Sequence, residues 1–150
     1  MTARTHDLTL SRRFGVPRQD VWRAWTTCET DNQWSAPEGF TISQCRIDAR
    51  AGGTWEITMR QSSGESLTVG GTYREVQAPE RLVSTHAWRS ADGSRGHETV
   101  MTVDLAERDG GTEMTLRQTG FDSAESRDGH RDGWSQCFDK LDAYLATHHR

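Results

Sequence analysis

The sequence lacks the features that would mark a membrane-spanning, secreted or metal-binding protein. It contains no run of 18 apolar residues, and its opening segment, MTARTHDLTL, is too polar for a signal peptide. The three cysteines, Cys28, Cys45 and Cys137, are widely spaced and form no CxxC pair, and the histidines and cysteines lack the spacing of a zinc site. We therefore expect a cytoplasmic protein that contains buried, reduced thiols and no metal.

Signals for nucleic-acid binding, cofactor binding and nucleophilic catalysis are also missing. The chain of 150 residues has a formal net charge of −4, so no basic surface predicts nucleic acid or a membrane as a partner. There is no GxSxG elbow and no GxxxxGK loop, and the Gly-Gly pairs are interpreted as hairpin turns. No cofactor and no catalytic residue is predicted. Because 33% of the residues are hydrophobic and 27% are charged, the composition instead predicts one folded domain over residues 1–150.

Hydrophobic periodicity predicts an α+β protein. A first strand covers residues 6–14, a short amphipathic helix begins at Pro17, and another helical turn carries Trp34 before Pro37. Six segments of strand character then follow, at residues 40–49, 54–60, 67–76, 81–89, 97–105 and 112–121. The links between these segments are too short for crossover helices, so the strands should form an antiparallel meander.

A final helix is predicted over residues 130–145. Its apolar face consists of His130, Trp134, Cys137, Phe138, Leu141, Tyr144 and Leu145. An apolar face along the whole length predicts that this helix lies across the concave face of the sheet. Gly133 costs about 1 kcal/mol relative to alanine inside a helix. Two explanations stay open: the glycine leaves space for close backbone approach or for a bound molecule, or it marks an irregular first turn.

Five segments occur in an order and at separations that resemble a known bacterial family. They are VPRQDVWRAWT, DARAGGTWEI, GGTYREVQAPERLVSTHAW, GGTEMTLRQTGF and HRDGWSQCFDKLDAYL. The family is related to the C-terminal domain of activators of Hsp90 ATPase and belongs to the START-like (SRPBCC) superfamily. The resemblance extends from Leu8 to Leu145. It implies the helix-grip fold, in which a curved antiparallel sheet wraps around a long C-terminal helix and leaves an internal pocket.

The resemblance also implies several kinds of activity. Members of the superfamily bind lipids, polyketides, plant hormones or aromatic small molecules, and some are cyclases or hydrolases. In the eukaryotic co-chaperone that gives the family its name, the related domain is joined to a second domain, which we do not expect in this chain.

Tryptophan is abundant, with six residues in the chain. Trp34, Trp55, Trp88 and Trp134 come from four elements that the helix-grip fold brings towards one interior. Together they would form either an ordinary core or the aromatic walls of a small-molecule pocket.

Two histidines are candidates for the same interior. His86 shares one side of its strand with Trp88, and His130 extends the apolar face of the last helix. Each is either a satisfied or frayed structural histidine, or a group that orients a ligand or acts as a general base near neutral pH. His148 and His149 are interpreted as a mobile tail rather than a metal site. The predicted cavity lining is Trp34, Trp55, His86, Trp88, Phe121, His130 and Trp134.

Three functions follow as hypotheses. The first is binding of a small apolar or aromatic molecule in a cavity between the sheet and the C-terminal helix. The second is co-chaperone-like regulation of an Hsp90-type ATPase through protein–protein contact. The third is a cyclase or hydrolase reaction that uses a cavity histidine. The oligomeric state stays open between monomer and homodimer.

Overall fold

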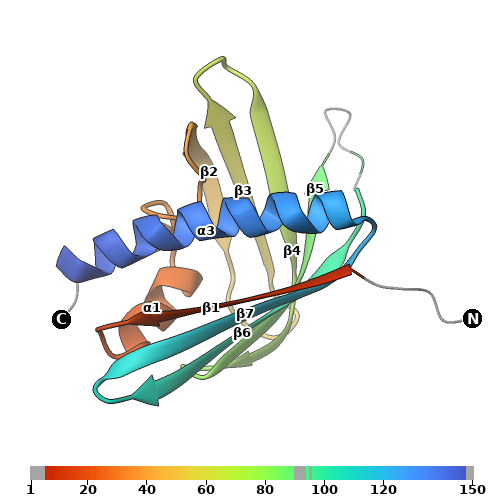
Figure 1. The fold of residues 1–150 in the computed structure, drawn as a ribbon. Coiled ribbons are helices and arrows are strands. Elements are labelled where there is room, and N and C mark those ends of the chain that lie inside the picture. The colour runs from red at the N-terminus through yellow and green to blue at the C-terminus, as the bar shows by residue number, and fades with distance from the viewer. Residues whose placement is uncertain (1–5, 90–93, 95, 148–150) are drawn as a thin grey trace, which may run out of the picture.

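The computed structural model describes residues 6–89, 94 and 96–147, and Figure 1 shows its helices and strands. The strands are β1 (His6–Phe14), β2 (Phe40–Ile47), β3 (Thr54–Gln61), β4 (Ser66–Gln77), β5 (Arg81–Arg89), β6 (Thr99–Arg108) and β7 (Gly111–Phe121). The helices are α1 (Arg18–Thr26), α2 (Cys28–Asp31) and α3 (Ala124–Thr147). This order of elements agrees with the sequence-based prediction. The predicted tail residues His148 and His149 lie outside the described residues.

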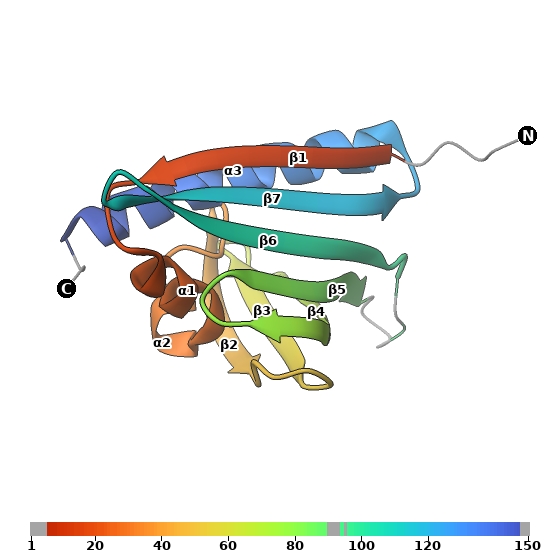
Figure 2. The ribbon, with the colours of Figure 1, turned by 90° about the horizontal axis from the view of Figure 1, so that it is seen from below.

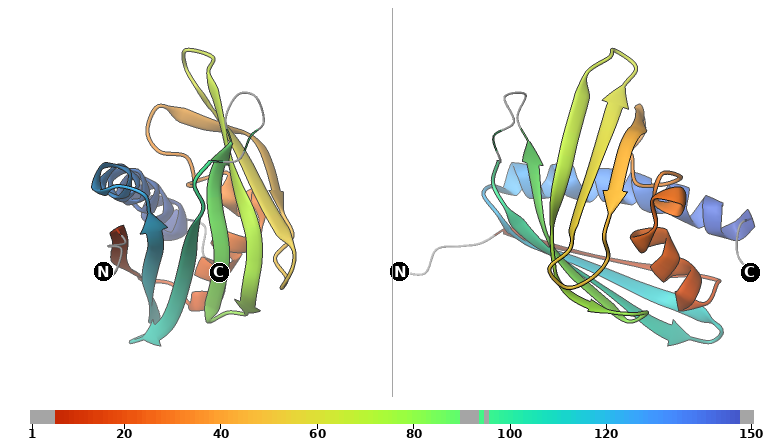
Figure 3. Two further views of the ribbon diagram at one scale, coloured as in Figure 1. Left: turned by 90° about the vertical axis from the view of Figure 1, so that its right-hand side faces the viewer. Right: turned by 180° about the vertical axis from the view of Figure 1, so that it is seen from behind.

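The strands form one antiparallel sheet in the order β1-β7-β6-β5-β4-β3-β2. The six strands that follow α2 therefore form the predicted meander, and β1 pairs with β7 at one edge. The sheet curls around α3, which lies across its concave face (Figures 1 and 3). Figure 2 shows that α1 and α2 lie at the same end of the molecule as the C-terminal end of α3. This is the α+β helix-grip arrangement that the sequence predicts.

The glycine pair of β4 does not form a hairpin turn. Gly70 and Gly71 lie in the middle of the strand, so the interpretation of every Gly-Gly pair as a turn is wrong here. A Cβ atom on Gly71 would lie 1.9 Å from the carbonyl oxygen of Thr85, and one on Gly70 would lie 2.6 Å from that of Trp55. The missing side chains therefore let the strands on both sides approach β4 closely. Gly52, by contrast, has a φ of +85° in the link between β2 and β3, as a turn requires.

The hydrophobic core fills one end of the concave side. The buried residues of α3 are Cys137, Phe138, Leu141 and Leu145, and all of them belong to its C-terminal half. They join a cluster with buried residues of α1 and β7, such as Val21 and Leu116. In the N-terminal half of α3, whose residues are all described, none is fully buried. The helix is thus packed firmly at one end only, and its other end spans a hollow.

The start of α3 lies six residues before the predicted start at His130. Ser123 precedes the helix, and its hydroxyl accepts a hydrogen bond of 3.0 Å from the Ser126 amide, as a helix N-cap does. Glu125 lies in the first turn, where a carboxylate is favourable. The prediction missed this turn because it adds no buried apolar residue to the periodic pattern. No helix among the described residues is long and apolar enough to cross a membrane.

Cys28 and Cys45 form a disulfide that joins α2 to β2. The prediction of three reduced thiols is therefore wrong for this pair, whereas Cys137 is a buried free thiol as expected. No local pattern indicates the pair, because 17 positions separate the two cysteines and only the fold brings them together.

Reduction of this disulfide is expected to lower the free energy of unfolding by about 3 kcal/mol, because the bond closes a loop in the unfolded chain. Chemical denaturation with and without a reductant measures the difference, and Cys137→Ser is the control that should leave it unchanged. In the denatured, unreduced protein, a thiol titration should detect Cys137 alone. Reaction of all the cysteines without reductant would contradict the bond.

Candidate ligand-binding pocket

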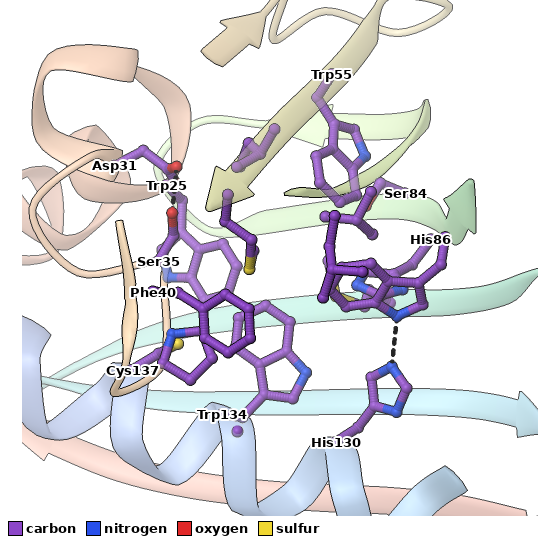
Figure 4. Close-up of a pocket in the computed structure, with 18 of the residues that line it drawn as sticks. Trp25, Asp31, Ser35, Phe40, Trp55, Ser84, His86, His130, Trp134 and Cys137 are labelled. Carbon is purple, nitrogen blue, oxygen red and sulfur yellow. Dashed lines mark hydrogen bonds between the residues drawn. The ribbon is translucent and has the colours of Figure 1, made fainter. Parts of the chain in front are cut away.

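A pocket of about 590 Å³ lies between α3 and the concave side of the sheet (Figure 4). This volume lies within the usual range for small-molecule sites, roughly 300–1,000 Å³. Side chains of β3, β4 and β5 form one wall, and the segment from Ser123 to Cys137 forms the other. Leu67 also lines the pocket. Among the described residues it is the one large hydrophobic residue that is exposed, at 41%.

Five tryptophans line the pocket: Trp25, Trp34, Trp55, Trp88 and Trp134. Every one of their indole N–H groups donates a hydrogen bond within the protein. The acceptors, in the same order, are Met114 Sδ (3.3 Å), the carbonyl oxygens of Ala24 (2.9 Å) and Thr85 (3.2 Å), His130 Nε2 (2.9 Å) and Gln118 Oε1 (2.9 Å). The indoles therefore present ring surface to the pocket and keep no free N–H donor for a bound molecule.

The aromatic side chains near the core hold one another in place. Trp25 contacts Trp34 edge-on with ring centroids 4.7 Å apart, and it contacts Trp134 at 5.6 Å. Trp134 in turn stacks on Phe138, with centroids 5.7 Å apart. Such contacts add about 0.5–1.5 kcal/mol each beyond area burial, so this wall of the pocket is formed before any ligand arrives.

His130 uses both of its ring nitrogens inside the protein. Its Nε2 accepts the hydrogen bond from Trp88, and its Nδ1 lies 2.7 Å from the carbonyl oxygen of Ser126. A carbonyl oxygen can only accept, so Nδ1 carries the proton and the ring is neutral. This arrangement orients the ring and leaves no lone pair for abstracting a proton from a ligand.

His86 lies in an aromatic cage at the same end of the pocket. Its ring centroid is 5.6 Å from those of Trp55 and His130 and 5.8 Å from that of Trp88. Burial is the largest cause of the low pKa of His86, which is about 3. The ring is therefore neutral at physiological pH, and it offers a ligand a hydrogen-bonding group rather than a charge.

Asp31 and Ser35 form the polar part of the opposite end (Figure 4). The Asp31 side chain is only 4% exposed, and its Oδ2 accepts a hydrogen bond of 2.7 Å from the Ser35 hydroxyl. Burial raises the pKa of Asp31 to about 7, although the bond from Ser35 acts in the opposite direction. Neither residue was predicted from the sequence. The available signal was an acidic residue one helical turn before Trp34.

Tyr73 and Cys137 also line this pocket, from β4 and α3. Burial raises the pKa of the Tyr73 phenol above its usual value, and the charge of Asp31 raises it further. Burial likewise raises the pKa of the Cys137 thiol to about 12. Both groups are therefore neutral and protonated. Since Tyr73 points inward, its neighbour Arg74 points outward, where it lies 3.9 Å from Glu98.

Two glycines of α3 face the pocket, Gly129 and Gly133, which lie one helical turn apart. A Cβ atom added to either would meet no atom within 4 Å. No other segment therefore approaches Gly133 closely, so the explanation by close backbone approach is wrong. Gly133 lies inside a regular helix, so the explanation as an irregular first turn is also wrong. The glycines leave space that a side chain would otherwise fill.

Gly133→Ala is expected to raise the free energy of unfolding by about 1 kcal/mol, because alanine is the better helix former and the site has room for a methyl group. Urea denaturation measures the change. Ala143→Gly, which places a glycine on the exposed side of the same helix, should lower the free energy of unfolding by a similar amount. A destabilised Gly133→Ala variant would show that the space is not available.

The structure brings six of the seven predicted lining residues into this pocket: Trp34, Trp55, His86, Trp88, His130 and Trp134. Phe121 lies outside it. Its ring packs on His130 with centroids 4.9 Å apart, beside a smaller hollow of about 100 Å³ behind the histidines. The described residues contain no cluster of three or more potential ligands that could hold a metal ion.

A curved antiparallel sheet that grips a long C-terminal helix, with a hollow on the concave side, defines the class of START-like helix-grip proteins. Within this class, the chain belongs to the family described as "Activator of Hsp90 ATPase homolog 1-like protein", which matches residues 15–146.

Solved structures and a curated relative agree with this assignment. The AHSA1 protein of Silicibacter pomeroyi is 28% identical with a TM-score of 0.86, covering 94% of this chain and 98% of that chain. A protein from Chromobacterium violaceum is 27% identical with a TM-score of 0.85, covering 93% and 96%. The human activator of 90 kDa heat shock protein ATPase homolog 1 is 23% identical over 134 residues, which are 89% of this chain and 35% of the human protein. The chain thus spans about a third of that relative's length.

Proposed function

We propose that the chain acts as one domain that binds a small apolar or aromatic molecule in the pocket between the sheet and α3. The observation that supports this function best is a hollow of about 590 Å³ walled by five indoles whose N–H groups are all satisfied internally. Aromatic walls of this kind favour ligands whose binding is driven by burial of apolar surface.

A thermal-shift screen with small aromatic compounds tests the proposal. A ligand at a hundred times its dissociation constant stabilises the folded state by about 2.7 kcal/mol, which corresponds to a rise in Tm of about 5–10 °C for a chain of this size. Binding should also change the tryptophan emission, because five of the six tryptophans line the pocket. A broad screen that yields no stabilising compound would contradict the proposal.

Gly133→Leu should abolish this binding while the protein stays folded. The leucine side chain would project into the free space of the pocket, and leucine is a better helix former than glycine. Ala143→Leu places the same side chain on the exposed face of the same helix and is the matched control. Equal affinity of the two variants for a compound found in the screen would show that the compound binds elsewhere.

Regulation of an Hsp90-type ATPase is the second candidate, and membership of the family supports it. The human relative is named as an activator of that ATPase. Measuring the ATPase rate of an Hsp90 chaperone with and without this protein tests the idea, and an unchanged rate would exclude it. Gly133→Leu separates the two functions, because a surface contact would survive filling of the pocket.

The cyclase or hydrolase hypothesis receives less support from the geometry. Both nitrogens of His130 are engaged, and the pKa of His86, lowered to about 3, makes it a weak base at neutral pH. We therefore do not propose an enzymatic reaction for these histidines.

A further inference from the structure

The charges around the pocket are strongly one-sided. Its lining residues, all of them described, include the carboxyl groups of Asp31 and Glu125 but no arginine and no lysine. This is notable in a chain with 18 basic residues. The histidines do not supply positive charge either, because His130 is held neutral by its two hydrogen bonds and His86 is buried in an aromatic cage.

A ligand with a carboxylate or phosphate would therefore find no cation to pair with. Moving an anion from water into such a site is costly unless a positive group or several hydrogen-bond donors compensate it. The five indole N–H groups cannot serve as donors, since each already has an acceptor in the protein. Fatty acids and aromatic carboxylates would find only hydroxyl donors, such as those of Tyr73 and Ser84, and no positive group, so the lining disfavours them relative to cations.

Asp31, by contrast, is a suitable partner for a cationic group. The side chain is 4% exposed and lines the pocket, and Ser35 is the hydrogen-bond partner of its carboxyl group in the described part of the chain. Its acceptor capacity is therefore only partly used. When ionised, this carboxylate is a buried anion with no basic group beside it, so the folded protein already bears the cost of removing it from water. A cationic ligand would recover part of that cost.

We propose that the ligand is a lipophilic amine whose aromatic or apolar body lies among the indoles and whose ammonium group pairs with Asp31. This inference rests on the proposed binding function and specifies the ligand class. Trp25, which lines the same pocket as Asp31 and Ser35, adds an aromatic ring of the type that attracts organic cations. The neutral His86 ring at the far end is left to contact the uncharged part of the molecule.

Three probes with the same aromatic body test the charge preference by isothermal titration calorimetry. They are 2-(naphthalen-1-yl)ethylamine, 2-(naphthalen-1-yl)ethanol and naphthalen-1-ylacetate. Near pH 8 the amine should bind about tenfold to a hundredfold more tightly than the alcohol, as expected for a charged hydrogen-bonded pair, and the carboxylate should bind most weakly. Binding of the alcohol and amine with equal affinity would overturn the amine inference but leave the proposed function intact. Binding of none of the probes would overturn both.

Asp31→Asn isolates the contribution of the charge. The variant keeps the shape of the side chain and an oxygen for Ser35, so the alcohol should bind as before while the amine loses its tenfold to hundredfold advantage, again on the order of a charged pair. Glu125→Gln tests the other carboxyl group of the lining, which is exposed. If Glu125→Gln weakened amine binding as much as Asp31→Asn, the ammonium would not be at Asp31.

The pH dependence gives an independent readout. Below about pH 7, Asp31 must release a proton before it can pair with an ammonium, so amine affinity should fall about fivefold to fifteenfold between pH 7 and pH 5.5, whereas alcohol affinity should not change. The titratable groups that face Asp31 are Tyr73 of β4 and Cys137 of α3, both of which stay protonated over this range. Asp48 in turn interacts electrostatically with Tyr73, and Lys140 interacts electrostatically with Cys137. Loss of the pH dependence in Asp31→Asn is the expected result, and its persistence would contradict the assignment.

Discussion

Asp31→Asn is expected to raise the free energy of unfolding by about 4 kcal/mol near pH 8 and to leave it almost unchanged near pH 4. Burial raises the pKa of Asp31 from 3.8 in the unfolded chain to about 7 in the folded protein. Above this pH the folded state holds a buried carboxylate that the unfolded chain would expose to water. Asparagine removes the charge and keeps the oxygen that accepts the bond from Ser35.

The direction of the pH dependence follows from the raised pKa. Between about pH 4 and pH 7 the folded state binds more protons at Asp31 than the unfolded state, so the wild-type protein loses stability at this site as the pH rises through that range. Urea denaturation of both proteins across the range measures the effect. Glu125→Gln, which alters an exposed carboxyl group, should not show it. A variant no more stable than the wild type near pH 8 would show that Asp31 is not an uncompensated charge.

His86→Phe is expected to show the opposite pH dependence. The free energy of unfolding should rise by about 3 kcal/mol near pH 4 and change little near pH 8. Burial is the largest cause that lowers the pKa of His86 from 6.5 to about 3 in the folded protein. The wild type therefore loses stability at this site as the pH falls from about 6.5 towards 3, because His86 binds a proton in the unfolded state but not in the folded state. Phenylalanine fits the same aromatic surroundings and does not titrate.

Acid denaturation of the wild type and the His86→Phe variant tests this expectation. His97→Asn is the control for loss of one histidine, since the His97 side chain is exposed. Equal stability of the wild type and the His86→Phe variant near pH 4 would be inconsistent with a buried neutral ring at this position.

The two groups act in opposite directions between about pH 4 and pH 6.5. Asp31 favours proton uptake on folding and His86 opposes it, so their contributions to the slope of stability against pH largely cancel in the wild type. Each single variant should reveal the slope of the group that remains. Figure 4 shows the two side chains at opposite ends of the pocket, which supports treating their contributions as additive.

The strands and the inward-facing tryptophans could be predicted because each depends on local pattern. Trp55, Ile57 and Met59 alternate along β3 and are all buried, since successive side chains of a strand point to opposite faces. In α3, Phe138 and Leu141 recur at helical spacing and both face the core. Such periodicities identify the buried face of an element without knowledge of what covers it.

Other features depended on contacts between distant positions. The Cys28–Cys45 bond requires α2 to lie beside β2, and no local pattern records that. Asp31 was not predicted as a site residue, because only the packing of α2 against α1 and β2 buries its carboxyl group. The start of α3 at Ala124 was missed because its first turn is polar on all sides and covers the edge of a hollow rather than a core.

By itself, the sequence determined the order of strands and helices and the apolar face of each, because hydrophobic spacing encodes which side of an element avoids water. Only the tertiary structure decided that α3 is packed along its C-terminal half and stands away from the sheet at Gly129 and Gly133, and that a lone carboxyl group is buried opposite a neutral histidine. The physical reason is that burial and the free space between elements are set by how far a curled sheet stands from a straight helix, a distance that no local pattern contains.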